Sequence, residues 1–325
     1  MININTQSQT QPDITNKIIL APMEGVIDPL MRKILCSIND YDLCIIEFLR
    51  IVDSLMPANV FYRICPELNN GAYTSNKTPL RMQLLGQEPQ WMAENAVRAL
   101  ELGSHGIDVN FGCPAKTVNK SKGGAALLKD PEKIYQILST IKKSIDNKAI
   151  LSAKIRLGFD DTLLFDEIIS AVNSSGAQEL AIHARTKSDG YKPPAYWNYI
   201  NHAVNKSHIK IIANGEIWNR ESAQECIRAS NTTNIMLGRG ALSLPNIANT
   251  IKYGHKAMDW LELQELLLVY SEQELIGDKS YYFSSRLKQW LRYLKLQYPQ
   301  AEHLFQQIKT LKNKDEILDI IKRIS

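Results

Sequence analysis

Eight short apolar segments recur between residues 18 and 237, and most of them end in a polar residue or a glycine. They cover residues 18–21, 43–48, 78–84, 107–110, 151–157, 180–183, 209–213 and 234–237. Short apolar runs without strict alternation are typical of parallel strands buried on both faces. Stretches with helical spacing separate them, at residues 28–36, 89–102, 131–145 and 165–175. This order predicts an α/β fold, with a (β/α)8 TIM barrel over residues 18–250.

A doubly wound open sheet is the alternative that the same order of elements allows. Two features favour the barrel. The number of strands reaches eight by about residue 245, and polar side chains follow nearly every strand, where a barrel builds its active site.

The two ends of the chain differ from this central part. Residues 1–17 are polar and lack the apolar core of a signal peptide, so we expect a disordered N-terminal tail. Residues 251–325 contain no evident strand, and helical patterns at 261–276, 281–298, 301–311 and 316–324 predict a small helical bundle.

The charge of the chain is concentrated in this helical bundle. The whole sequence has 38 Lys and Arg against 34 Asp and Glu, but residues 279–314 have eight basic residues and only Glu302 as an acid. Such a cluster indicates a polyanionic partner, although a solvated helix face gives the same pattern. Tyr281, Tyr282, Trp290 and Tyr293 lie among these charges and either stack on bases or belong to the core.

Composition excludes several classes of protein. The five cysteines form no CxxC pair and no His/Cys cluster, which argues against a zinc site or a disulfide framework. No apolar run approaches the ~20 residues that a membrane span requires. We therefore expect a cytoplasmic, metal-free protein. We also expect a monomer, which does not follow from these features.

Cys113 is the most informative single residue. It follows the apolar segment 107–110, and Pro114 restricts its backbone to an extended conformation at the tip of the strand. A lone cysteine is more often a small packing residue, but Lys116, Lys120 and Lys122 predict a flexible, electropositive loop here instead of a core. Lysines favour a nucleophilic thiolate, whereas an unperturbed thiol is protonated at neutral pH and acts as an acid. The residues alone leave both roles open.

Other strand ends suit a phosphate-bearing ring cofactor. Residues 214–216 and 238–240 follow the seventh and eighth strands, where barrels commonly bind phosphate. Lys154 in the fifth strand pairs with Glu24 or Glu216, contacts an anionic flavin, or forms a Schiff base. Gln83 has the donor and acceptor that a flavin edge requires.

Several motifs together resemble the tRNA-dihydrouridine synthases. They are APMEGVID at 21–28, NFGCPAKTV at 110–118, GGAALL at 123–128, KIRLG at 154–158, HARTK at 183–187, ANGEIW at 213–218 and GRGAL at 238–242. Residues 47–50, 65–68 and 286–290 are similar to the bacterial C-type subfamily, which acts on uridine 16 of tRNA.

The resemblance implies an FMN-binding barrel followed by a tRNA-binding helical domain, with NADPH or NADH as reductant. It assigns Cys113 as the catalytic residue. It implies FMN contacts at Pro22, Met23, Glu24, Gln83, Lys154, His183, Asn214, Gly215, Glu216, Gly238 and Arg239. Residues that read or orient the tRNA are then Arg50, Asn110, Tyr191, Arg286, Lys288 and Lys309.

The resulting hypothesis is reduction of a tRNA uridine, with hydride delivered to C6 and a proton from Cys113 to C5. An FMN oxidoreductase of free pyrimidines, of the dihydroorotate or dihydropyrimidine dehydrogenase type, is the nearest alternative, but it has no need of the basic helices. A Schiff-base aldolase that uses Lys154 and a noncatalytic RNA-binding protein are the others.

Overall fold

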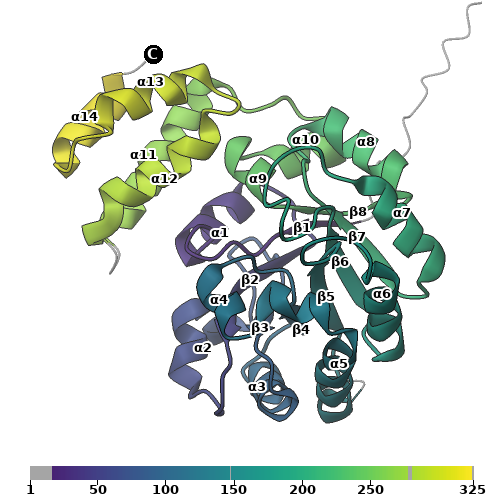
Figure 1. The fold of residues 1–325 in the computed structure, drawn as a ribbon. Helices are drawn as coiled ribbons and strands as arrows, with labels where there is room; N and C mark the ends of the chain where they lie inside the picture. Colours follow the sequence, from purple (N-terminus) through teal and green to yellow (C-terminus); the bar gives the residue numbers. More distant parts are fainter. Residues whose placement is uncertain (1–16, 147, 277–279, 324–325) are drawn as a thin grey trace, which may run out of the picture.

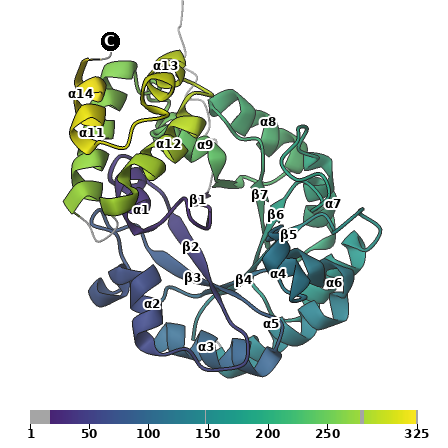
Figure 2. The same ribbon diagram turned by 60° about the vertical axis from the view of Figure 1, so that its left-hand side comes forward.

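A closed barrel of eight parallel strands forms the centre of the computed structural model, which describes residues 17–146, 148–276 and 280–323 (Figures 1 and 2). Each strand pairs with the next along the chain, and the last pairs with the first. The strands are β1 (Lys17–Leu20), β2 (Leu43–Arg50), β3 (Leu80–Leu85), β4 (Ile107–Asn110), β5 (Leu151–Arg156), β6 (Glu179–His183), β7 (Lys210–Asn214) and β8 (Asn234–Leu237). The predicted barrel is confirmed, and the open sheet is not formed. The predicted tail lies outside the described residues except for Lys17, which begins β1.

Helices surround the barrel, and side-chain caps start several of them. Asp28 accepts a hydrogen bond from the Met31 backbone N–H at the start of the first helix, and Asp130 does the same for Lys133. The helices after the strands include α1 (Pro29–Ser37), α3 (Pro89–Glu101), α5 (Pro131–Ile145), α6 (Phe165–Ser174), α7 (Trp197–Lys206), α8 (Arg220–Ser230) and α10 (Ile247–Tyr253). Short apolar stripes face the strands, as the sequence predicts for α1, α3, α5 and α6.

Shorter helices, which were not predicted, lie in the connections between the strands and the longer helices. They are α2 (Ala58–Ile64), η1 (Pro66–Asn70), α4 (Lys116–Lys120), η2 (Gly124–Lys129) and α9 (Arg239–Ser243). The sequence predicts a loop after Cys113, but two short helices, α4 and η2, form there instead. Val118 is buried against Cys113, and Asn119 donates a side-chain hydrogen bond to the Cys113 carbonyl, which together hold α4 in place.

The remaining helices pack together beside α1 and α9 (Figure 1). They are α11 (Trp260–Ile276), η3 (Ser280–Tyr282), α12 (Phe283–Leu294), α13 (Pro299–Ile308) and α14 (Lys314–Arg323). Leu287, Leu291 and Leu294 form the apolar face of α12 and are buried. Trp290 is also buried and donates from its indole N–H to the Leu242 carbonyl of α9, so it is a core residue. Among the described residues, no helix is both long and apolar enough to span a membrane.

The interior of the barrel is divided into an apolar part and a polar part. One apolar cluster lies inside the barrel and includes Ile19, Ile45, Ala181, Ile212 and Met236. Polar side chains occupy alternate positions of β3, β4 and β5 and are also buried, namely Arg81, Gln83, Asp108, Asn110, Ser152 and Arg156. Buried polar groups need hydrogen-bond partners, and these form a network that continues to the face carrying the cavity.

Candidate active site

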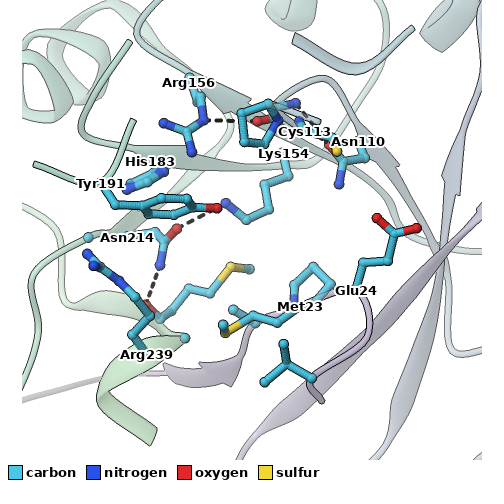
Figure 3. Close-up of a pocket in the computed structure, with 18 of the residues that line it drawn as sticks. Met23, Glu24, Asn110, Cys113, Lys154, Arg156, His183, Tyr191, Asn214 and Arg239 are labelled. Atoms are coloured by element: carbon cyan, nitrogen blue, oxygen red, sulfur yellow. Dashed lines mark hydrogen bonds between the residues drawn. The ribbon is translucent and has the colours of Figure 1, made fainter. Parts of the chain in front are cut away.

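A cavity of about 690 Å³ opens at the carboxyl ends of the strands (Figure 3). It brings together thirteen of the residues singled out in the sequence: Pro22, Met23, Glu24, Asn110, Cys113, Lys154, His183, Tyr191, Asn214, Gly215, Glu216, Gly238 and Arg239. These residues come from seven separate segments of the sequence, and only the folding of the barrel brings them together. The carboxyl-terminal face is where barrel enzymes place their active sites.

Cys113 is held on a tight turn at the end of β4. The Asn110 side-chain oxygen accepts from the backbone N–H groups of Gly112 and Cys113, both at 2.9 Å. Cys113 lines the cavity and is 8% exposed. Burial raises the pKa of its thiol and the nearby Glu24 carboxylate adds to this, whereas Arg156 opposes it. The thiol is therefore protonated at neutral pH, which favours the role of an acid over that of a nucleophile.

Lys154 points into the cavity from β5. Its ammonium donates to the Asn214 side-chain oxygen at 3.0 Å. Burial, and to a lesser extent the neighbouring Arg156, lower its pKa to about 8, whereas Asp108 acts in the opposite direction. The amide of Asn214 is itself oriented, because its nitrogen donates to the Met236 carbonyl. A buried amine of this kind is stabilised in its charged form by an anionic ligand.

His183 lies at the end of β6 among cations. It is 7% exposed, and burial lowers the pKa of its imidazole well below the usual value, with Arg156 and Lys154 contributing. The ring is therefore neutral at pH 7, so one of its nitrogens donates a hydrogen bond and the other accepts one.

Two arginines share the carboxylate of Glu216, which lines the cavity. Glu216 pairs with Arg239 at 2.6 Å and with Arg185 at 2.8 Å, so it does not serve as the partner of Lys154. The Arg239 guanidinium lies 5.0 Å from the ring centroids of both Tyr191 and Trp218. Burial opposes ionisation of Glu216, but the two arginines and the Trp218 N–H hold its pKa below the usual value. The carboxylate thus fixes the orientation of Arg239 at the cavity.

The main chain approaches the cavity closely where glycines follow β7 and β8. Gly215 has φ of +123°, and a Cβ there would lie 3.0 Å from the His183 ring. A Cβ on Gly240 would lie 2.0 Å from the Ile217 carbonyl oxygen. Another residue at Gly215 would have a strained φ and crowd the His183 ring, and one at Gly240 would displace the backbone at Ile217.

These surroundings fit an anionic, planar ligand such as a phosphate-bearing flavin. The cavity wall carries Lys154, Arg156 and Arg239, and the buried Arg185 side chain has a terminal nitrogen, Nη1, with no hydrogen-bond partner. Met23 and Met236 supply an apolar surface for a ring. An anion would satisfy the excess positive charge that the protein itself leaves uncompensated.

Some residues of the cavity were not predicted from the sequence. Arg156 lies two positions after Lys154 on the same face of β5, and this spacing is a signal that could have identified it. Trp218 was part of a recognised motif but had no assigned role. Tyr293 reaches the cavity from α12, and no local pattern signals this, because only the packing of the helices against the barrel brings it there.

Five of the predicted residues lie outside the cavity. Gln83 is fully buried beneath it, hydrogen-bonded to Asp108 and Asn110. Arg50 is exposed and donates to the Ser121 hydroxyl. The other three lie in the C-terminal helices, and their predicted contacts with tRNA stay predictions: Arg286, Lys288 and Lys309.

The three helical residues have different surroundings. Arg286 pairs with Asp28 at 2.6 Å and Glu274 at 2.5 Å, and its side chain is only 13% exposed. Lys288 donates to the Leu311 carbonyl, and Lys309 donates to the Gln306 side chain. Arg286 therefore joins α12 to α11 and to the start of α1, whereas Lys309 is at the surface.

Comparison with known proteins agrees with this site. A family model described as dihydrouridine synthase (Dus) matches residues 19–325. A tRNA-dihydrouridine(16) synthase from Shewanella oneidensis is 53% identical over 94% of this chain and 98% of its own length. One with the same name from Vibrio vulnificus is 51% identical over 93% of this chain and 96% of its own length.

Solved structures share the barrel at low identity. DHODH from Eimeria tenella has a TM-score of 0.57 at 13% identity and covers 83% of this chain and 89% of its own. Histamine dehydrogenase from Rhizobium sp. 4-9 has a TM-score of 0.56 at 11% identity and covers 79% of this chain and 49% of its own. These likenesses concern the fold, whereas the family model and the relatives match more than nine-tenths of the sequence. The chain belongs to the dihydrouridine synthase family of enzymes.

Proposed function

We propose that this enzyme reduces uridine 16 in the D-loop of tRNA to 5,6-dihydrouridine, with bound FMN and with NADPH or NADH as reductant. The observation that carries the proposal is a protonated thiol facing a cavity with a cationic wall. The relatives named tRNA-dihydrouridine(16) synthase support the position of the uridine.

The residues that would hold FMN lie on both sides of the cavity. Lys154 and His183 reach the cavity from β5 and β6 and would contact the ring, and Met23 lies across the cavity from them (Figure 3). Arg239 and the loops at Gly215 and Gly238 would hold the phosphate. The chemistry that FMN supplies when bound is transfer of a hydride from the nicotinamide to C6 of the uracil ring.

Cys113 would complete the reduction by donating its thiol proton to C5. An added hydride and an added proton together account for the two hydrogens of dihydrouridine. The raised pKa keeps the proton on sulfur until the substrate is in place, and Arg156 stabilises the thiolate that remains. The thiol then regains its proton from water.

The tRNA would bind across the cavity and the C-terminal helices. A uridine must leave its stack to reach the strand ends, as bases do in other enzymes that modify them. Tyr191 and Asn110 lie at the cavity, and Arg50, Lys288 and Lys309 would contact the rest of the tRNA. We assign residues 18–250 to catalysis and 251–325 to tRNA binding, in a cytoplasmic monomer.

The decisive experiment maps dihydrouridine in tRNA from a strain that lacks the gene. We expect it to be absent at position 16 and restored by the wild-type gene. Persistence of dihydrouridine 16 in the deletion strain would contradict the proposal. Loss at another position instead would leave the reaction intact and change its site.

A further inference from the structure

A chain of hydrogen bonds crosses the interior of the barrel and ends at the turn that carries Cys113. It involves Arg81 and Gln83 of β3, Asp108 and Asn110 of β4, and Ser152 of β5. All five are buried, and each pair on one strand occupies alternate positions, so their side chains point into the barrel.

Ser152 and Arg81 hold one side of the Asp108 carboxylate. Its Oδ1 accepts from the Ser152 hydroxyl at 2.5 Å, and that hydroxyl in turn accepts from Arg81 at 2.9 Å. The same Arg81 nitrogen donates to Glu179 at 2.7 Å. The second carboxylate oxygen of Asp108 is directed toward the cavity side of the barrel, where it accepts from Gln83 Nε2 at 2.6 Å.

The direction of each hydrogen bond is determined by Asp108. An ionised carboxylate only accepts, so the Gln83 amide must present its nitrogen to Asp108 and its oxygen to Asn110. The Asn110 nitrogen donates to that oxygen at 2.9 Å, which leaves the Asn110 oxygen for the N–H groups of Gly112 and Cys113. A reversed amide at either position would place two donors against each other.

We propose that Asp108 is a positioning residue, which orients the amides of Gln83 and Asn110 and thereby holds the Cys113 turn in its reactive geometry. The catalytic consequence rests on the proposed function, in which Cys113 is the proton donor. The effect of Asp108 on the conformation of the turn does not rest on that function, and it can be measured without turnover.

The test compares Asp108→Leu with Asp108→Asn in the flavin-loaded enzyme. Leucine has a similar size but no acceptor, whereas asparagine keeps one oxygen for Gln83.

The rate of Cys113 alkylation by iodoacetamide reports on the turn, because the other four cysteines are at most 1% exposed and Cys113 lines the cavity. We expect Asp108→Leu to be alkylated at Cys113 about tenfold faster, as the turn opens locally. Turnover of tRNA should fall about 10- to 100-fold at unchanged tRNA affinity. Asp108→Asn should stay close to wild type in both measurements.

A double-mutant cycle identifies the route. If Asp108 acts through Asn110, adding Asp108→Leu to Asn110→Ala should change neither the alkylation rate nor kcat further. Additive effects would overturn the proposal, as would a folded Asp108→Leu protein with wild-type alkylation. Equal losses of turnover in Asp108→Asn and Asp108→Leu would overturn it too, because the charge alone would then be responsible.

If Asp108→Leu does not fold, Gln83→Leu interrupts the same chain of hydrogen bonds, and the same changes in alkylation and turnover are expected. Altered alkylation in an enzyme whose wild type makes no dihydrouridine would contradict only the proposed function.

Discussion

The state of the Cys113 thiol depends on residues that are distant in sequence. The lysines that follow it suggested a lowered pKa, yet burial and Glu24, from the loop after β1, raise it. Pro114 is near in sequence and was recognised as a constraint on the turn, whereas Asn110 was predicted only to read or orient the tRNA. The sequence could thus predict where the thiol is held, but its protonation depends on the folded surroundings.

Replacing Cys113 tests its role as proton donor. We expect Cys113→Ala to keep its flavin and to bind tRNA, but to lose turnover by about 10²- to 10⁴-fold, the usual contribution of a general acid. Single-turnover assays with reduced enzyme would measure this. A variant with full turnover would remove Cys113 from the mechanism.

Lys154 predicts a pH dependence of flavin binding. Its pKa in the free protein is about 8, so the amine is charged below pH 8 and becomes neutral above it. An anionic ligand prefers the charged form and raises the pKa in the complex. Affinity should therefore be full below pH 8 and fall above it, by up to about tenfold per pH unit.

Quenching of flavin fluorescence between pH 7 and pH 9 would measure this dependence. Lys154→Met is the control: it should bind flavin more weakly at pH 7 and show no fall through pH 8. A wild-type affinity that stays constant over this range would contradict an electrostatic role for Lys154.

At the level of elements, the strands were predictable and the short helices were not. Each strand lies in a short segment rich in apolar residues, and eight such segments in a row are a strong signal. Elements such as α4 and α9 have only five residues, too few for a helical period to be recognised, and they depend on contacts with the barrel. Gln83 shows the limit of sequence-based prediction at the candidate site. Alternation along the strand places its side chain inside the barrel, but the sequence does not say whether it contacts a ligand or another side chain.

The Arg286 cluster joins elements that are far apart in the chain. We expect Arg286→Met to lower the free energy of unfolding by about 3 kcal/mol, because it removes the shared cation from two buried carboxylates. Lys309→Met, at the surface, should change it by less than about 0.5 kcal/mol. Urea denaturation measures both. Equal stabilities would show that Arg286 is not a structural link.

At the level of the whole molecule, basic residues gather on the helices beside the cavity. The net charge of the chain is only +4, but residues 279–314 have eight basic residues against one acid. Arg286 and Lys295 already pair with carboxylates, so fewer cations are available for phosphates than the sequence suggests. This difference between formal and available charge is not visible in the sequence.

Salt dependence of tRNA binding should report the available charge. Changing Lys309 and Lys312 to Gln should make the slope of log K against log salt shallower by about 2, one for each lost phosphate contact. Lys143→Gln, on α5 across the molecule from these helices (Figure 1), should leave the slope unchanged. Identical slopes in all three proteins would place the tRNA on another surface.

Tyr293 makes one helix of the C-terminal region part of the cavity wall. Because Trp290 and Arg286 of the same helix also attach to the barrel side, exchanging these helices between relatives would alter the reaction chamber itself. Chimeras built to redirect modification to another nucleotide would therefore need the barrel's matching contacts transferred as well, and those lacking them should lose catalytic rate along with any gain in selectivity.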